Sequence, residues 1–348
     1  GLSGSMSARD QDAALADSRE GRRRVIVATD IAESSLTVAG VRIVVDAGLV
    51  RVPRQDPASA TTRLQTEPAS LASADQRAGR AGRLGPGVAY RLWDPAEASR
   101  RPRFAVAEID VADLTGLALE LAVWGADPGE LALVDQPPEG AWAQARTVLR
   151  HLGAVDRAGH PTPLGRAMAD LPVHPRLAAL AVRGRDQARG WTAAVLAAVL
   201  TERDVLRGHP DELPADLAPR VELVGSRRAS HPHADRHARS RARRRADQIA
   251  RRLGVGAEDL DLDAIGLLTA VAHPERIAQA GGAGGFRLRG GGGGRLAKSD
   301  PLAASPFLAV ARIDEGPSGP QIRMAAHLSD DQVESLVAND HVERVVLR

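Results

Sequence analysis

Residues 25–37 read VIVATDIAESSLT and residues 76–83 read QRAGRAGR, and these two stretches decide the fold of the first part of the chain. The first begins as an apolar run behind basic residues, which is typical of a buried parallel strand. Its small polar residues then predict a loop and the start of a short helix. A second apolar run, VRIVVDAGLV at 41–50, predicts another strand. The pattern indicates an α/β domain.

The other segments up to residue 95 fit the same class. Residues 51–66 predict two short strands around an Asp-Pro turn, which would form a projecting hairpin. A helix is expected over 73–83, ending before the breaker Gly85-Pro86-Gly87. Residues 88–94, VAYRLWD, predict a closing strand. We therefore assign 1–95 to one α/β domain, which is incomplete.

Beyond residue 95 the pattern becomes mainly helical. Residues 96–172 predict a winged-helix domain, because two helical stretches flank a short wing. Alanine-rich and apolar helices over 173–279 predict a helical bundle, and glycine-rich short strands over 280–348 predict a small β-rich, OB-like segment. Three tryptophans stand at apolar helical positions and are expected in the core. They are Trp124, Trp142 and Trp191.

The composition is that of a globular protein with an unusual set of cations. Of the 348 residues, 43% are hydrophobic and 26% are charged, and Lys298 is the single lysine among 46 lysines and arginines. The absence of cysteine excludes disulfides, thiolate metal sites and cysteine nucleophiles. No apolar run approaches the roughly 20 residues of a membrane span, and the N-terminus does not resemble a signal peptide. We expect a cytoplasmic protein with no membrane partner.

The spacing within QRAGRAGR suits a phosphate. On a helix, Arg80 and Arg83 share a face as i and i+3, with Gln76 one turn below Arg80. Gly79 and Gly82 leave room for a bulky anion. Two guanidinium groups and an amide would then converge on one phosphoryl group. The alternative is a solvated arginine face on an alanine-rich helix.

The residues after the first strand suit a nucleic-acid backbone. Thr29 and Asp30 lie where that strand ends, and Ser34 and Ser35 lie at the expected helix start. Hydroxyls and free backbone N–H groups at such a point bind phosphates and sugars. Taken alone, the stretch would be an ordinary strand-to-helix turn.

Together the two stretches resemble motifs V and VI of the superfamily-two DEAH-type helicases. The downstream segments DLTGLALELAVWGADPGELALVDQPP (113–138), HPRLAALAVRG (174–184) and RLRGGGGGRLAKSDPLA (287–303) are most similar to the HrpB-type branch. The resemblance covers nearly the whole chain. It implies that 1–95 is the second of two RecA-like lobes of an ATP-dependent RNA helicase.

The resemblance also implies roles for individual residues. Arg80 and Arg83 would be arginine fingers, Gln76 would contact the γ-phosphate of ATP, and Gly79 and Asp30 would belong to the nucleotide site. Magnesium would accompany the ATP. A second group would touch single-stranded RNA or DNA. Its members are Thr29, Ser34, Ser35 and Arg54, the last on the hairpin.

One part of the family pattern does not occur. Neither G-x-x-x-x-G-K-[ST], which cradles phosphates, nor D-E-x-H, which serves magnesium, is found in the sequence. GGGGRLAKS near Lys298 misses the first pattern, because Ala297 stands where glycine is needed. We therefore expect the chain to be a C-terminal portion that needs the missing first lobe as its partner. Alone it should have no significant ATPase activity, because catalysis of this type depends on positioning by both lobes.

A second basic stretch lies at 229–254. The segment from Arg227 to Arg252 contains ten arginines and only two aspartates. Arg241 and Arg244 are the expected nucleic-acid contacts. The stretch contains no aromatic residue for base stacking, so a solvated face remains the alternative. His231, His233 and His237 have metal-ligand spacing, but the arginines would repel a cation, and no metal is expected.

Two other functions remain open. The chain could be a non-enzymatic nucleic-acid-binding module, or a scaffold whose winged helix contacts other proteins. RNA binding that ignores Arg80 would favour the first, and absence of RNA binding at low salt would favour the second.

Overall fold

The computed structural model describes residues 1–2, 6, 8–16, 24–34, 38, 40–56, 61–209, 211–282, 284–316 and 319–338. The chain divides into two compact units. Unit 1 consists of 1–54 and 63–111, and unit 2 of 55–62 and 112–348.

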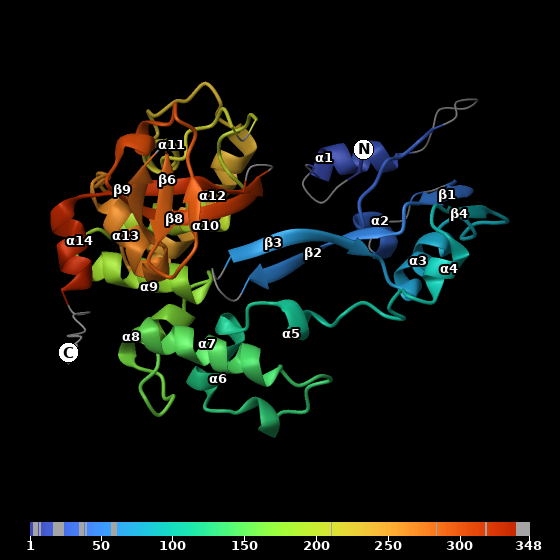
Figure 1. The fold of residues 1–348 in the computed structure, drawn as a ribbon, viewed down its shortest axis with the longest axis horizontal. Helices are drawn as coiled ribbons and strands as arrows, with labels where there is room; N and C mark the ends of the chain where they lie inside the picture. Colours follow the sequence, from blue (N-terminus) through green and yellow to red (C-terminus); the bar gives the residue numbers. More distant parts are fainter. Residues whose placement is uncertain are drawn as a thin grey trace, which may run out of the picture. The chain divides into compact units, whose positions relative to one another are not determined.

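Unit 1 is an α/β unit (Figure 1). Strands β1 (Ile43–Asp46) and β4 (Val88–Arg91) pair in parallel, with Ile43 opposite Val88 and Val45 opposite Tyr90. Helix α3 (Leu71–Gly79) packs against both strands. The other helices are α1 (Ala8–Leu15), α2 (Ile31–Ser34), α4 (Pro95–Ala98) and α5 (Glu108–Val111). Two further strands, β2 (Leu49–Asp56) and β3 (Thr61–Pro68), have most of their residues in unit 1.

Strands β2 and β3 pair with each other as a two-stranded sheet and confirm the predicted hairpin. They form the long ribbon labelled in Figure 1. Arg54 lies on β2, where the structure does not describe its side chain.

The first predicted strand is wrong. Residues 24–27 are not in a strand, and Val25 and Val27 are 90% and 75% exposed. A strand requires a neighbour for its backbone groups, and among the described residues this run forms a single bridge, between Ala28 and Leu2. The apolar side chains predicted burial, but within the described part of the chain no second strand lies alongside to provide it.

The arginine-rich helix also ends earlier than predicted. α3 stops at Gly79, and the backbone N–H groups of Arg80 and Ala81 bond to carbonyls three residues back, at Arg77 and Ala78. Glycine is a poor helix former, and the closely spaced glycines favour this tighter last turn. Arg83 therefore lies beyond the helix.

The helices of unit 2 centre on α10 (Gly190–Thr201), which is buried along nearly its whole length. It packs against α9 (Pro175–Asp186), α11 (Ala218–Gly225), α12 (Arg236–Leu253) and α13 (Ala264–Ala272). Alanine on several sides of α10 lets these neighbours approach closely. The remaining helices are α6 (Thr115–Trp124), α7 (Glu139–His151), α8 (Pro163–Ala169) and α14 (Asp330–Val337).

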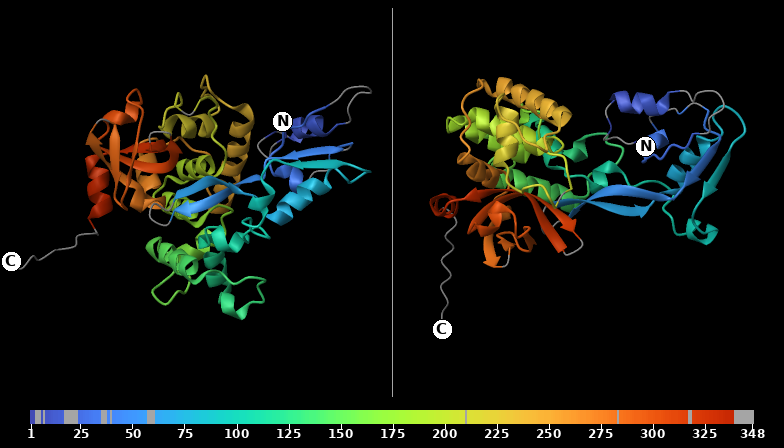
Figure 2. Two further views of the ribbon diagram at one scale, coloured as in Figure 1. Left: turned by 45° about the vertical axis from the view of Figure 1, so that its right-hand side comes forward. Right: turned by 90° about the horizontal axis from the view of Figure 1, so that it is seen from above.

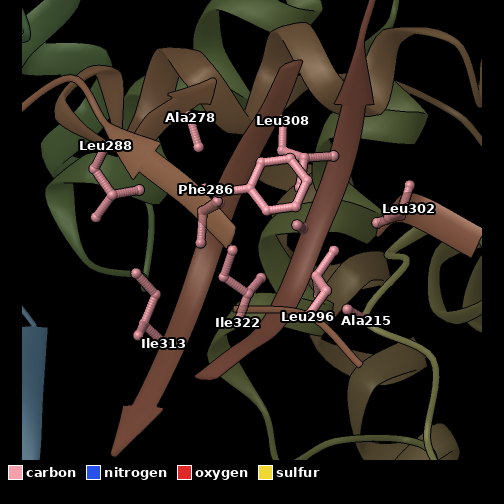
Figure 3. Close-up of a cluster of buried hydrophobic side chains, with 11 residues drawn as sticks. Ala215, Ala278, Phe286, Leu288, Leu296, Leu302, Leu308, Ile313 and Ile322 are labelled. Atoms are coloured by element: carbon pink, nitrogen blue, oxygen red, sulfur yellow. The ribbon is translucent and has the colours of Figure 1, made fainter. Parts of the chain in front are cut away.

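Five strands of unit 2 close into a barrel in the order β5-β6-β7-β9-β8. They are β5 (Ile277–Gly282), β6 (Gly285–Leu288), β7 (Gly293–Arg295), β8 (Phe307–Gly316) and β9 (Gly319–Leu328). Phe286, Leu308 and Ile322 are among the side chains that fill it (Figure 3). Figure 2 shows the barrel, in orange and red, from two further sides.

Helix α13 packs against β8 and β9 of the barrel. Its contact requires a glycine, because a Cβ at Gly266 would lie 2.0 Å from the carbonyl oxygen of His327. The bundle and the barrel therefore share a packed boundary.

One of the three tryptophan predictions is wrong. Trp191 is 2% exposed, whereas Trp124 is 70% exposed. α6 is apolar around its circumference, and its core-facing positions are taken by Leu119 and Leu121 instead. Since every face looked apolar, the sequence pattern gave no means of choosing the buried one.

Among the described residues, no helix combines the length and the apolar character that crossing a membrane requires.

Candidate phosphate site and arginine surfaces

Helix α3 is fixed at its start by a side-chain cap. The hydroxyl of Ser70 accepts a hydrogen bond from the backbone N–H of Ser73 at 3.1 Å, which satisfies one of the free donors of the first turn. The helix then presents Gln76 and Gly79 on one side and carries the chain into the turn that holds Arg80 and Arg83.

These four residues meet in one place. Gln76, Gly79, Arg80 and Arg83 line an open pocket of about 400 Å³, together with Glu33 of α2. A Cβ at Gly79 would meet no other atom within 4 Å, so the glycine leaves open space beside the pocket. The predicted geometry on a continuous helix is wrong, but the turn after Gly79 still brings both arginines to the pocket.

The two arginines differ in what they contact. Arg80 donates from Nε to the carbonyl oxygen of Glu33 at 3.0 Å, and its Nη2 donates to the same oxygen. Arg83 is exposed, and its guanidinium has no hydrogen-bond partner within the described ranges. Arg80 is therefore oriented in advance, while Arg83 and the exposed Gln76 present donors to solvent.

Arg77 is the residue that sequence reasoning missed. Its Nε donates to Oε2 of Glu33 at 3.0 Å, and its Nη1 donates to Oδ1 of Asp46 and to the carbonyl oxygen of Leu49, both at 3.1 Å. Ser73 donates from its hydroxyl to the other oxygen of Glu33 at 2.7 Å. Arg77 and its two carboxylate partners are largely buried.

Arg77 thus holds α3 to α2 and to the end of β1, and it is not among the residues that line the pocket. A signal for this role exists in the sequence, since Asp46 is a carboxylate at the end of the apolar run VRIVVD. Carboxylates are rarely buried without a partner.

The residues predicted to contact nucleic acid are only partly placed. Thr29 and Asp30 are exposed, and their carbonyl oxygens accept from the N–H groups of Ala32 and Glu33 at the start of α2. Asp30 does not line the pocket. Ser34 is the last residue of α2, with a side chain that the structure does not describe, and Ser35 lies outside the described residues.

The arginines of α12 divide into two sets. Arg239, Arg243, Arg245 and Arg252 each donate to main-chain carbonyl oxygens of neighbouring segments of unit 2. Arg243 also lies over the Trp191 ring at 4.7 Å. These side chains hold the bundle together and are not available as a continuous wall.

The second set faces solvent. Arg241 and Arg244 are exposed, with His237 and Arg251 one turn or two along the same face of the helix. Arg241 approaches Glu202 at 3.7 Å, and Arg244 donates to the hydroxyl of Ser240 at 2.7 Å, within α12 itself. The two predicted contacts are thus among the arginines of α12 that could reach a ligand.

The chemistry of both surfaces is that of anion recognition. Guanidinium groups match phosphate geometry and stay charged near neutral pH. Within the part of the chain that the structure describes, no three His, Cys, Asp or Glu side chains gather where a metal ion could be held.

Comparison with known proteins extends this picture. Residues 1–85 match the helicase conserved C-terminal domain family. The chain is 35% identical over 332 residues to the ATP-dependent RNA helicase HrpB of Escherichia coli (strain K12), covering 95% of this chain and 38% of that protein. A crystal structure of E. coli DExH-box NTPase HrpB matches with a TM-score of 0.78 at 34% identity, over 97% of this chain and 40% of that one. Over nearly its whole length, the chain is similar to the HrpB-type DEAH/RHA helicases.

Two further relatives match shorter parts. E. coli HrpA is 34% identical over 200 residues, 56% of this chain and 15% of that protein. The human probable ATP-dependent RNA helicase DHX34 is 38% identical over 173 residues, 49% of this chain and 15% of that protein. This HrpB-like chain therefore spans well under half the length of each of these relatives. Of the three, HrpB matches along nearly the whole chain, in agreement with the HrpB-type segments of the sequence.

Proposed function

We propose that this chain supplies the arginine fingers and RNA contacts of an ATP-dependent RNA helicase, which couples nucleoside triphosphate hydrolysis to unwinding or translocation. The observation that carries the proposal is the convergence of Gln76, Arg80 and Arg83 on one open pocket beside Gly79. The similarity of this chain to HrpB, HrpA and DHX34, which are all named as ATP-dependent RNA helicases, supports the proposal.

In this proposal the pocket receives the terminal phosphate of ATP. Arg83 and Arg80 would neutralise the negative charge that develops on the transferred phosphoryl group, and Gln76 would donate an amide hydrogen bond. Arg80 already lies on the carbonyl oxygen of Glu33. A phosphate would give it a stronger, charged acceptor. Asp30 would link the nucleotide site to the bound nucleic-acid strand.

The cofactor set is only partly matched by this chain. The donors present fit phosphate, and magnesium, when bound with ATP, neutralises the β- and γ-phosphate oxygens. The sequence contains neither the phosphate cradle nor the D-E-x-H motif. We infer that turnover requires a RecA-like lobe that carries both, and that this chain alone does not hydrolyse ATP at a significant rate.

Single-stranded RNA or DNA would bind along the protein residues that are predicted to contact nucleic acid. Thr29, Ser34, Ser35 and Arg54 would contact the strand from unit 1, and Arg241 and Arg244 from α12. We assign winged-helix, helical-bundle and OB-like roles to 96–172, 173–279 and 280–348. The short bridge between Val155 and Pro161 supports a wing, and the closed five-stranded barrel supports an OB-like domain. A cytoplasmic location belongs to the same proposal.

A chimera tests the proposal directly. This chain replaces the matching 38% of E. coli HrpB, and ATP hydrolysis is measured with and without single-stranded RNA. We expect RNA-stimulated turnover that falls at least about a hundredfold in Arg80→Ala and in Arg83→Ala, since each removes a charge from the transition state. Arg100→Ala is the matched control, because Arg100 is exposed and its side chain makes no described contact.

Gly79→Ala distinguishes an effect on phosphate binding from an effect on the stability of the fold. Its added methyl group meets no atom of another segment within 4 Å, and alanine favours the helix more than glycine does, so the substitution should not lower stability. A loss of turnover in this variant then reports crowding of the bound phosphate. Turnover that persists in all three pocket variants would contradict the proposal.

The exposed face of α12 favours one second candidate, a nucleic-acid-binding module without enzymatic activity. Under that alternative, RNA binding by this chain would be unaffected by Arg80→Ala but abolished when Arg241 and Arg244 are neutralised, and the chimera would show no turnover.

A further inference from the structure

The base of the β2–β3 hairpin is closed by one buried cation. Gly48 directly precedes β2 and Ala69 directly follows β3, and the N–H of Ala69 donates to the carbonyl oxygen of Gly48 at 2.9 Å. Arg101 donates from Nη1 to the same carbonyl at 2.7 Å and to that of Ala69 at 3.1 Å. Its side chain is 5% exposed, so both hydrogen bonds are shielded from water.

Trp93 packs closely against this joint, by which we mean Gly48, Ala69 and Arg101 at the base of the hairpin. The guanidinium of Arg101 lies 4.3 Å from the centre of the Trp93 ring, within the range of a cation–π contact. Gly48 has φ of +69°, and a Cβ there would lie 2.4 Å from Trp93 Cε3. Only glycine fits without a shift of the ring. Glu97, 3.6 Å from Arg101, balances the buried charge.

The joint is also connected to the phosphate pocket. Asp46 Oδ1 accepts from the N–H of Gly48 at 2.9 Å and from Arg77 Nη1 at 3.1 Å. Arg77 in turn donates to the carboxylate of Glu33, and Glu33 is one of the residues that line the pocket. A continuous path of hydrogen bonds therefore runs from Glu33 through Arg77, Asp46 and Gly48 to Arg101.

We propose that Arg101 is a positioning residue that fixes the direction of the β2–β3 hairpin, and that Arg77 ties the hairpin base to the phosphate pocket. The inference rests on the proposed function, in which the hairpin contacts nucleic acid while the pocket holds phosphate. If α3 moved, the base of β2 would then move with it, because the hydrogen bonds would hold the two as one rigid body. Neither residue would touch ATP or RNA at its own guanidinium.

A distance measurement tests the role of Arg101. The sequence has no cysteine, so Gln65→Cys on β3 and Ala89→Cys on β4 can each carry a spin label at an exposed position. Pulsed electron spin resonance on the full chain should give one narrow distance distribution. Arg101→Ala should broaden it at least twofold. Arg101→Lys should broaden it less, because lysine keeps a cationic donor, and Arg100→Ala should leave it unchanged.

A second variant covers the case in which Arg101→Ala unfolds the unit. Gly48→Ala keeps Arg101 but pushes on Trp93, and it should shift the mean distance while amide exchange of α3 stays slow. Unchanged distributions in both Arg101→Ala and Gly48→Ala would overturn the inference. The measurement uses no nucleotide or RNA. If the HrpB chimera hydrolyses ATP but the hairpin distances are the same in Arg101→Ala and Gly48→Ala as in the unaltered chain, this inference alone is refuted. If the chimera is inactive but Arg101→Ala broadens the distances, the proposed function alone is refuted.

Discussion

Helices α3 and α12 both carry closely spaced arginines, but the two regions use them in different ways. At α3, Arg77 bonds to two carboxylates, whereas Arg80, which bonds to a main-chain carbonyl, and Arg83 both line an open pocket. At α12, four arginines bond to main-chain carbonyls and only part of the helix presents arginine to solvent. The comparison teaches that the number of arginines is a poor guide to anion binding. What decides is how fully the protein already supplies acceptors to each guanidinium group.

The largest effect should come from an arginine used wholly by the protein. Arg220 of α11 is 1% exposed and donates to both oxygens of Asp204 and to the carbonyls of Pro214 and Asp216. Arg220→Ala removes the charged donor from the Asp204 carboxylate, which keeps only the N–H of Leu206 among its described partners, and should cost about 3–5 kcal/mol of stability. Urea denaturation measures the loss. Arg207→Ala, at a 74% exposed side chain, should change stability by no more than about 0.5 kcal/mol.

The next effect concerns a buried histidine among arginines. Burial, together with the charges of Arg276 and Arg176, lowers the pKa of His273 to about 4 against the opposing attraction of the Glu275 carboxylate, 3.8 Å away. The unfolded chain binds this proton near pH 6.5, so stability should be complete above pH 6.5 and fall as pH drops toward 4. The loss is on the order of 3 kcal/mol.

Stability measured between pH 7 and 4 tests this sign. His273→Gln should flatten that part of the curve, whereas His151→Gln, at an exposed position on α7, should not. A wild-type curve that rises toward pH 4 would show that the arginine-lined site accepts the proton, which would contradict the structure.

A smaller effect should separate two adjacent arginines of α12. Arg243→Ala removes hydrogen bonds to the carbonyls of Val224 and Gly225 and the packing against Trp191, and should cost about 2 kcal/mol. Arg244→Ala should stay within about 0.5 kcal/mol. Equal shifts of the urea midpoint would break the division of α12 into a structural and an exposed set.

The smallest effect on stability, and the clearest on ligand binding, is expected at the exposed face. Neutralising Arg241 and Arg244 together should leave the fold unchanged and reduce the salt dependence of oligouridine binding. The slope of log K against log salt should fall by roughly 0.7 for each phosphate that the variant no longer neutralises. Fluorescence anisotropy at several salt concentrations measures it, with Arg150→Ala on α7 as the control. An unchanged slope would leave the pocket at α3 as the sole anion surface of the two.

The sequence predicted the hairpin, the helices of unit 2 and the arginine cluster, because each depends on local patterns. It failed at residues 24–27 and at Trp124, where burial depends on what packs alongside. It also missed Arg77, since the pattern treats all three arginines of QRAGRAGR alike. Only contacts with the carboxylates of Asp46 and Glu33, distant in sequence, distinguish Arg77 from Arg80, which contacts the Glu33 carbonyl oxygen, and from Arg83.

The sequence by itself determined which residue types stand at which spacing: motif V and motif VI stretches at the right separation, and the absence of a phosphate cradle. The tertiary structure decided which guanidinium groups meet protein acceptors and which remain open to a ligand. The physical reason is that a guanidinium bonds to whichever acceptor the folded chain brings within about 3 Å, and that proximity is set by packing between segments far apart in sequence.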